Sequence, residues 1–394
     1  MTLKSYHTLD VQGKRVLIRV DFNVPVKNGK ILDNTRLRAA LATVKDVQAR
    51  GGKVILLTHF GRPKGRDPLL STAFLQPTLE EIFEGPVLFA PDGVAPSSVA
   101  TTQHLQDGEI LLVENLRFHA GEEKNDPTFA KELALLGDVY INDSFSISHR
   151  AHASVEGITK HLPSAAGACL LQEVEAVARA LTHPKLPVAA LVAGSKISTK
   201  LALLENLLPK VDFLILGGGI ANTFLRAQGY PIGSSLVEED MIHTAQQILE
   251  KAPLQDCRIV LPRDAVVAET LEGGNPHISP LDSITPTEKI FDIGPQTVTL
   301  IQEILDTCQT IVWNGPMGVF EVAPFHEGTA KLAQHVGSLT QKGQVFSIAG
   351  GGETVAAITS AGAANLFSYL SLAGGAFLEY LEGKTLPGVS ALKA

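Results

Sequence analysis

The sequence predicts an α/β protein with two doubly wound domains, each a parallel sheet flanked by helices, and two observations support this. At 394 residues the chain is too long for one ordinary hydrophobic core. Apolar runs rich in Val, Ile and Leu recur along it, are continuous rather than alternating, and are separated by stretches with helical spacing, as in strands buried on both faces. We expect these strands at residues 16–20, 54–58, 110–113, 139–142, 188–193, 213–216, 258–261, 310–313 and 345–349.

Four successive strands of the first half are each followed by Arg or His. Because ligands bind at the carboxyl ends of parallel strands, these residues are candidates for one site. They are Asp21, Asn23 and Arg36 after the first strand, His59 and Arg62 after the second, Arg117 after the third, and His149, Arg150 and His152 after the fourth. One such Arg alone is more often part of a surface salt bridge. Together they predict a small ligand that carries both phosphate and carboxylate.

Residues 171–182 have apolar positions at i, i+3, i+4 and i+7 and contain no Gly or Pro. This spacing predicts a helix that joins the two domains and is closed by His183 and Pro184.

The second half has glycine-rich turns after several strands, which is typical of a nucleotide site. Lys196 and Lys200 are four residues apart, so we expect both to point from one helix face toward a phosphate chain, although a solvated lysine pair is the simpler alternative. Residues 217–219 and 314–321 supply further glycine turns, and Glu321 is available to a ribose hydroxyl. No Gly-x-x-x-x-Gly-Lys-Ser/Thr sequence occurs, so the chain is not a P-loop enzyme.

The stretch from Gly350 to Ala357 predicts a strand end, a tight glycine turn and a helix N-terminus. Such a turn cradles anions, because glycines let the backbone approach phosphate and the first-turn N–H groups favour negative charge. Glu353 would repel phosphate there unless a cation lay between them, so it is a candidate Mg²⁺ ligand. A purely structural turn is the alternative.

Composition limits the classes of partner and the compartment. With 45% apolar and 19% charged residues, no membrane-length apolar run and no signal-type start, the chain reads as a cytoplasmic globular protein without a membrane partner. A net charge of −8 without a broadly basic face argues against nucleic acid. Cys169, Cys257 and Cys308 lack metal-type spacing and read as buried thiols. No coiled-coil heptad or swapping arm is evident, so we expect a monomer.

Six motifs together resemble phosphoglycerate kinase, from about Thr8 to Leu392. They are residues 19–25 (RVDFNVP), 59–65 (HFGRPKG), 114–119 (ENLRFH), 149–154 (HRAHAS), 313–321 (WNGPMGVFE) and 381–389 (LEGKTLPGV). The resemblance implies two Rossmann-like domains that face each other across a hinged cleft. It implies a 3-phosphoglycerate domain over 1–170, an interdomain helix over 171–184, a nucleotide domain over 185–375, and a tail, 376–394, that packs back on the first domain.

The implied reaction is reversible phosphoryl transfer between 1,3-bisphosphoglycerate and MgADP, which gives 3-phosphoglycerate and MgATP. The residues implied for 3-phosphoglycerate are Asp21, Asn23, Arg36, His59, Arg62, Arg117 and Arg150. Those implied for nucleotide and Mg²⁺ are Lys196, Lys200, Gly218, Gly219, Asn314, Pro316, Val319, Glu321, Gly351, Gly352, Glu353 and Thr354. Arg36, Lys196 and Gly352 would stabilise the transferred group. No general base is required, because the acceptor carboxylate is already ionised.

The chain departs from the family pattern at several positions. Glu353 stands where Asp is usual, Ser195 and Thr199 replace Ala and Asp near the lysines, and residues 142–148 alter the Ala-Phe-Gly-Thr-Ala segment. Tyr369, Leu372, Ala373 and Phe377 replace His, Thr, Gly and Ser in a hinge and phosphate loop. We read these as changes in kinetics or closure. A relative that binds the ligands without turnover, or a scaffold for a partner protein, are the alternatives.

Overall fold

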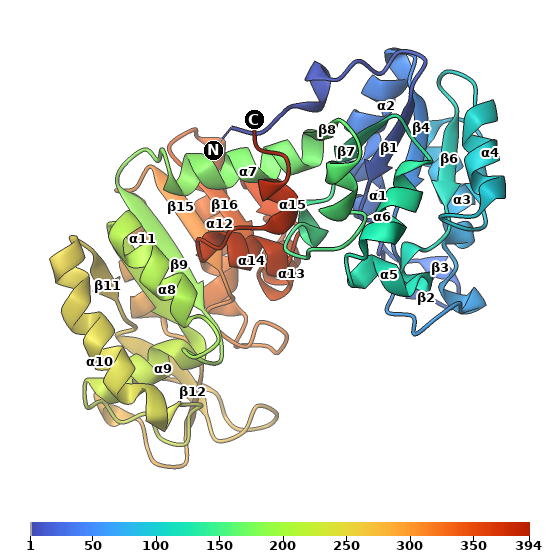
Figure 1. Cartoon of the computed structure of the whole chain (residues 1–394). Coiled ribbons are helices and arrows are strands. Elements are labelled where there is room, and N and C mark those ends of the chain that lie inside the picture. Colours follow the sequence, from blue (N-terminus) through green and yellow to red (C-terminus); the bar gives the residue numbers. More distant parts are fainter. Residues whose placement is uncertain (1) are drawn as a thin grey trace. The chain divides into compact units, whose positions relative to one another are not determined.

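The computed structural model describes residues 2–394 and separates them into two compact units (Figure 1). The first unit comprises the residues up to Val174 together with Thr385–Ala394, and the second comprises Glu175–Lys384. The division falls inside helix α7 (Ala168–Leu181). The domain ranges given above from the resemblance stay predictions.

A six-stranded parallel sheet forms the centre of the first unit, with the strand order β5-β6-β4-β1-β7-β8. Its side chains alternate between two cores: Val16 and Ile18 of β1 join one, and Leu17 joins the other. The strands are β1 (Arg15–Arg19), β4 (Lys53–Leu57), β5 (Val87–Ala90), β6 (Ile110–Val113), β7 (Val139–Asn142) and β8 (Ser164–Ala166). The helices are α1 (Thr35–Ala39), α2 (Leu41–Ala49), α3 (Gln76–Phe83), α4 (Pro96–His104), α5 (Ala120–Glu123), α6 (Pro127–Ala134) and α15 (Pro387–Ser390).

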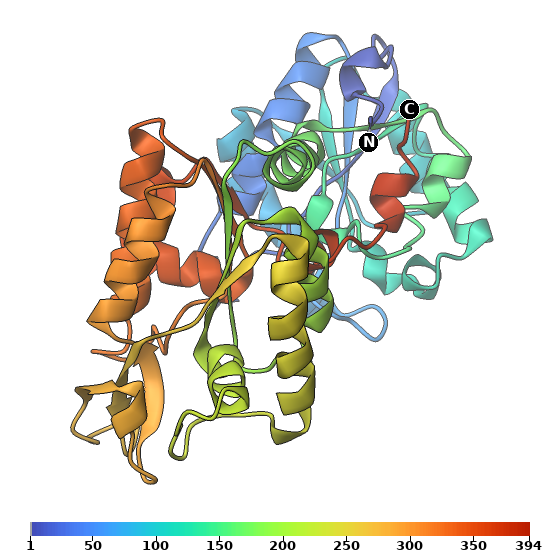
Figure 2. The same cartoon turned by 90° about the vertical axis from the view of Figure 1, so that its left-hand side faces the viewer.

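The second unit has its own six-stranded parallel sheet, in the order β11-β10-β9-β15-β16-β17, with Trp313 of β15 fully buried in its core. Its strands are β9 (Val188–Ala193), β10 (Phe213–Gly217), β11 (Arg258–Val260), β15 (Thr310–Asn314), β16 (Phe346–Gly350) and β17 (Tyr369–Ser371). Its helices are α8 (Leu201–Leu207), α9 (Gly218–Ala227), α10 (Ile242–Lys251), α11 (Pro295–Leu305), α12 (Glu327–Gln341), α13 (Gly352–Ser360) and α14 (Gly375–Leu381). In Figure 2 the orange α12 lies on one side of this sheet and the yellow α10 on the other.

The fold class is confirmed, because both units are parallel sheets flanked by helices. All nine predicted strands are present, with ends within one residue of those expected. The sequence did not reveal the edge strands β5, β8 and β17, the hairpin β2 (Val26–Lys27) and β3 (Lys30–Ile31), or the small antiparallel sheet β13-β12-β14. That sheet is formed by β12 (Asp264–Ala268), β13 (His277–Pro280) and β14 (Lys289–Ile293). No helix within residues 2–394 has the length and apolar content needed to cross a membrane.

Candidate active site

The strand-end residues of the first unit gather at one sheet edge. Strands β6, β4, β1 and β7 are consecutive neighbours and all parallel, so their carboxyl ends meet on one side. Residues following these four strands include Asp21 and Asn23 after β1, His59 after β4, Arg117 after β6, and Arg150 after β7. Helix α1, which begins one residue before Arg36, adds this guanidinium to the same group.

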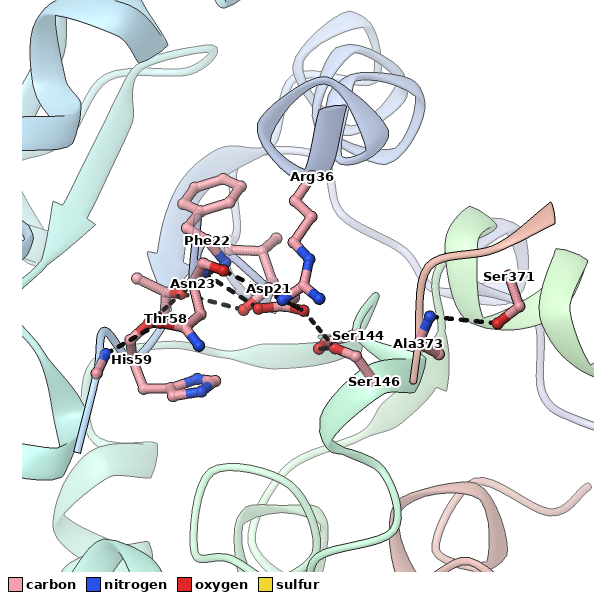
Figure 3. Close-up of polar contacts among 12 residues, drawn as sticks. Asp21, Phe22, Asn23, Arg36, Thr58, His59, Ser144, Ser146, Ser371 and Ala373 are labelled. Carbon is pink, nitrogen blue, oxygen red and sulfur yellow. Dashed lines mark hydrogen bonds and ion pairs between the residues drawn. The ribbon is translucent and has the colours of Figure 1, made fainter. Parts of the chain in front are cut away.

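Asp21 is the centre of the hydrogen bonds in this cluster (Figure 3). Its Oδ2 accepts hydrogen bonds from Arg36 Nη1 at 2.9 Å and from Ser146 Oγ at 2.6 Å, while its Oδ1 accepts from the backbone N–H of Asn23 at 3.1 Å. Arg36 Nη1 also donates to the carbonyl oxygen of Asn23 at 3.1 Å. The carboxylate is therefore held from three directions, and the guanidinium is fixed beside it.

Loop 59–65 is bound to the neighbouring strand ends through Gly61. The backbone N–H of Gly61 donates to Asn23 Oδ1 at 3.0 Å, and its carbonyl oxygen accepts from Arg117 Nη1 at 2.7 Å. Gly61 has φ +63°, a conformation that favours glycine. Arg62 is exposed and contributes positive potential at Arg117, and Arg150 is exposed and does so at His152.

Two histidines beside these arginines, His59 and His152, are held neutral. Burial, followed by the positive charges of Arg19 and Arg117, brings the pKa of His59 well below its ordinary value. The same causes lower the pKa of His152 to about 4. The positive charge of the cluster therefore comes from arginine, which stays protonated throughout the physiological range.

A buried polar network lies beneath His59, and sequence reasoning gave its members no role. Arg19 is fully buried and donates from Nη2 to His59 Nδ1 at 3.0 Å and from Nε to Ser154 Oγ at 2.9 Å. Ser154 Oγ in turn donates to Oε1 of the fully buried Glu122 at 2.5 Å. The available signal was an arginine inside an otherwise apolar strand run, because such a charge needs a buried partner.

The second unit contains a cavity of about 450 Å³ at the carboxyl end of its sheet. Apolar side chains such as Leu236, Leu281 and Phe291 line it. Six of the residues predicted for nucleotide also line it: Gly218, Gly219, Pro316, Val319, Glu321 and Glu353. A mostly apolar cavity with a few polar groups is typical of a small-molecule or cofactor site.

Two glycines at the start of α9 are required by close backbone packing. A Cβ on Gly218, whose φ is +63°, would lie 2.8 Å from the carbonyl oxygen of Gly194. A Cβ on Gly219 would lie 2.3 Å from the carbonyl oxygen of Ser195. No larger residue fits at either position without displacing the loop after β9.

The expectation that Lys196 and Lys200 share a helix face is wrong. Helix α8 begins only at Leu201, with Lys200 as its N-cap, and Lys196 is exposed in the preceding loop. That loop turns because Thr199 Oγ1 donates to the carbonyl oxygen of Lys196 at 2.8 Å. Lys200 Nζ donates to Asn314 Oδ1 at 2.7 Å and to the carbonyl oxygen of Ala193, and burial lowers its pKa to about 8.

The predicted strand, glycine turn and helix N-terminus at residues 350–357 are confirmed. Strand β16 ends at Gly350, Gly351 is the N-cap with φ +100°, and α13 begins at Gly352. The Thr354 hydroxyl accepts from the backbone N–H of Gly315 at 2.7 Å, and Asn314 Nδ2 donates to the carbonyl oxygen of Gly350 at 2.8 Å. These two bonds fix the turn against the loop after β15.

The residues present fit a metal ion that arrives with the nucleotide. Within residues 2–394, no group of three or more His, Cys, Asp or Glu side chains could hold an ion alone. Glu353 is exposed, lines the cavity, and stands in the first turn of α13, where phosphate would be held. Mg²⁺ commonly uses one protein carboxylate together with substrate phosphates, so a single Glu is sufficient.

The residues that depart from the family pattern near the C-terminus have structural partners. The backbone N–H of Ala373 donates to Ser371 Oγ at 3.2 Å (Figure 3). Ala373 precedes the N-cap Gly374, and α14 begins at Gly375. Phe377 is fully buried, and a Cβ on Gly350 would lie 2.4 Å from its ring.

Comparisons with known proteins agree with this arrangement. Residues 6–384 match the family model described as Phosphoglycerate kinase. The chain is 52% identical over 396 residues to phosphoglycerate kinase of Rhodospirillum centenum, with 100% of both chains covered, and 51% identical to that of Xanthobacter flavus, with 98% and 97% covered. The solved structure of phosphoglycerate kinase from Coxiella burnetii gives a TM-score of 0.92 at 43% identity over 99% of each chain. The chain therefore belongs to the phosphoglycerate kinase family.

Proposed function

We propose that this protein is a phosphoglycerate kinase, which transfers a phosphoryl group between 1,3-bisphosphoglycerate and MgADP to give 3-phosphoglycerate and MgATP, a step of glycolysis and gluconeogenesis. The observation that carries the proposal is that arginines follow neighbouring parallel strands at their carboxyl ends, with Arg36 held on Asp21. Family membership gives the reaction class.

The strand-end residues of the first unit suit each chemical group of 3-phosphoglycerate. Its phosphate and carboxylate are anions, and guanidinium groups bind both with parallel hydrogen bonds. We assign this role to Arg36, Arg62, Arg117 and Arg150, with neutral His59 as a further donor. The Asp21 carboxylate would repel both anions, so its partner is the neutral C2 hydroxyl, and the Asn23 amide supports the same end of the ligand.

The cavity of the second unit is assigned to ATP or ADP. Gly218, Gly219, Pro316 and Val319 form its walls and suit the base, and Glu321 suits a ribose hydroxyl. We place the phosphates along Lys196, Lys200, Asn314 and the first turn of α13 from Gly351 to Thr354. The support is electrostatic, because that turn offers unpaired backbone N–H groups and two lysines precede α8.

Mg²⁺ would be held by Glu353 together with the nucleotide phosphates, and when bound it neutralises part of the charge on the transferred group. The chain itself supplies the remaining charges. The acceptor carboxylate is ionised at neutral pH, so no proton is removed. Arg36, Lys196 and the backbone N–H of Gly352 stabilise charge that develops on the phosphoryl oxygens.

ATP-dependent phosphorylation of 3-phosphoglycerate, coupled to NADH oxidation, tests the proposal. We expect turnover in Mg²⁺, and a loss of about 100-fold or more in kcat for Arg36→Ala and for Lys196→Ala, because each removes a charge from the transition state. Binding of both ligands without turnover would instead support a binding relative, for which the family evidence gives no ground. Binding of neither ligand would support a scaffold.

We further propose a monomer in the cytoplasm. A single set of ligand residues within one chain supports the monomer, since the assignments above require no second copy. Sedimentation equilibrium at assay concentration and fractionation of cells check both statements.

A further inference from the structure

We propose that Ser146 is a positioning residue for the acceptor site, which it serves by holding Asp21 so that this carboxylate selects the C2 hydroxyl of the substrate. The inference rests on the proposed function. It concerns a residue to which neither the sequence motifs nor the family resemblance gives a role.

The geometry places the Ser146 hydroxyl directly on Asp21 (Figure 3). Ser146 lies in the 3-10 turn Phe145–Ile147 after β7, half-buried, and its Oγ is 2.6 Å from Asp21 Oδ2. This oxygen also accepts from Arg36 Nη1 at 2.9 Å. The hydroxyl is therefore the third member of the Asp21 and Arg36 ion pair.

The direction of each hydrogen bond follows from chemistry. A carboxylate only accepts, so Ser146 donates its one proton to Asp21. Ser144 Oγ lies 3.2 Å from Ser146 Oγ, and it must donate in that pair because the Ser146 proton is already used. The resulting chain runs from the buried Ser144 through Ser146 to Asp21, and each bond strengthens the next.

This arrangement decides which Asp21 oxygen is available to the substrate. A carboxylate has about four acceptor positions. Arg36 and Ser146 use Oδ2, and the backbone N–H of Asn23 uses one position on Oδ1. One position on Oδ1 remains for a hydroxyl of the substrate. Without Ser146, the Arg36 guanidinium could bind both oxygens of Asp21 in a two-point ion pair. The carboxylate would then rotate, and the guanidinium would no longer be available to the ligand.

Kinetics with two acceptors tests the proposal: 3-phosphoglycerate, and its deoxy analogue 3-phosphooxypropionate, which lacks the C2 hydroxyl. For Ser146→Ala we expect KM for 3-phosphoglycerate to rise roughly three- to tenfold, the size of one lost hydrogen bond. The preference for 3-phosphoglycerate over the analogue, as the ratio of kcat/KM values, should fall by the same factor. KM for MgATP should stay unchanged, and Ser146→Thr, which keeps the hydroxyl, should restore the preference.

Ser148→Ala is the matched control in the same loop. Ser148 Oγ donates to the carbonyl oxygen of Ser144 at 2.8 Å and accepts from Asn142 Nδ2 at 3.1 Å, so it supports the loop without touching Asp21. This variant should lower Tm and keep the acceptor preference. An equal loss of preference in Ser146→Ala and Ser148→Ala would show that Ser146 only supports the loop, and would overturn the inference.

Failure of this inference can be distinguished from failure of the proposed function. A wild-type enzyme that turns over beside a Ser146→Ala variant of unchanged preference overturns the role of Ser146 alone. Absence of wild-type turnover overturns the kinase assignment. Calorimetric titration of both acceptors without nucleotide then decides the role of Ser146, because the same change in relative affinity is expected there.

Discussion

Arg19 Nη2 and His59 Nδ1 lie 3.0 Å apart in the buried layer beneath the acceptor site. A guanidinium has only donors, so Nδ1 must be the acceptor and the imidazole proton must be on Nε2. His59 is thereby fixed as a neutral Nε2–H donor. Arg19, the last residue of β1, therefore sets the tautomer of a residue in the acceptor site.

Nitrogen-15 NMR of histidine-labelled protein should confirm this state. We expect Nδ1 of His59 to show no protonation step near pH 6.5, the ordinary pKa of histidine, because burial and the charge of Arg19 lower its pKa well below that value. Unfolded His59 takes up a proton below about pH 6.5 and the folded residue does not, so this site makes the protein less stable as pH falls. His59→Gln identifies the signal. Titration of that signal near pH 6.5 would refute the assignment.

Glu353 should affect the nucleotide and leave the acceptor unchanged. For Glu353→Gln we expect KM for MgATP to rise about tenfold, since the amide is a weaker ligand for Mg²⁺, while KM for 3-phosphoglycerate and Tm stay the same. Glu353→Asp, which keeps the charge, should stay within about threefold of wild type. Steady-state kinetics with both substrates varied decides this; parallel changes in both KM values would contradict the metal role.

Asp292 of β14 should make stability depend on pH. It is buried, which raises its pKa to about 7, and it accepts from the backbone N–H groups of Gly328 and Ile293 at 2.8 Å each. The folded state then binds more protons than the unfolded state between about pH 4 and 7, so this site loses stability as pH rises through that window. Asp292→Asn should reduce the loss of unfolding free energy across this pH window by on the order of 2–4 kcal/mol.

Denaturant titrations at pH 5, 6, 7 and 8 give the free energy of unfolding at each pH. The effect of Asp292 is the difference between wild type and variant in how steeply this free energy falls as pH rises. The comparison of slopes is needed because the amide also replaces one acceptor of the carboxylate, which shifts stability equally at every pH. Parallel curves for the two proteins would show that Asp292 is ionised throughout.

Two alanine substitutions at glycines should separate folding from catalysis. At Gly315, whose φ is +102°, a Cβ would lie 1.9 Å from the carbonyl oxygen of Ala193, so Gly315→Ala should cost at least about 2 kcal/mol of unfolding free energy. At Gly352 a Cβ meets no atom within 4 Å. Gly352→Ala should therefore keep or raise stability, by up to about 1 kcal/mol, because alanine suits a helix better.

The same Gly352→Ala variant should lose about tenfold in kcat/KM for MgATP, because its methyl group occupies the approach of phosphate to the helix N-terminus. Calorimetry of unfolding and steady-state kinetics on both variants check the pair. A fully active Gly352→Ala enzyme would remove Gly352 from the catalytic residues.

The buried parallel strands could be predicted because their residues carry the signal themselves. Runs such as Val188–Ala193 are apolar at every position and rich in Val, Ala and Leu, which is typical of a strand covered on both faces. The edge strand Val87–Ala90 is apolar as well, but it is only four residues long and lies between Pro86 and Pro91, which favour a loop. The turn before α8 was wrongly predicted as part of a helix for another reason. A spacing of four between Lys196 and Lys200 is equally compatible with a loop fixed by Thr199.

The contacts that complete the site could not be predicted, because they join residues far apart in the chain. Ser146 and Asp21 are 125 positions apart, and Arg19 and Ser154 are 135 apart. Strand order brings these residues together, and a single sequence gives the strand ends but not which side chain meets which. Arg36 and Asp21 were both predicted for the acceptor site, whereas Ser146, the second donor to Asp21 Oδ2, required the structure.

Phe377 and Gly350 show how a change at one position restricts change at another. The aromatic ring fills the space that any side chain at position 350 would need, with 2.4 Å between ring carbon and ideal Cβ. In a lineage that has acquired Phe377, the last residue of β16 can no longer vary, although it makes no contact with ligand through a side chain. Reversion to a small residue at 377 would have to come first, so the order in which these two sites can evolve is set by packing alone.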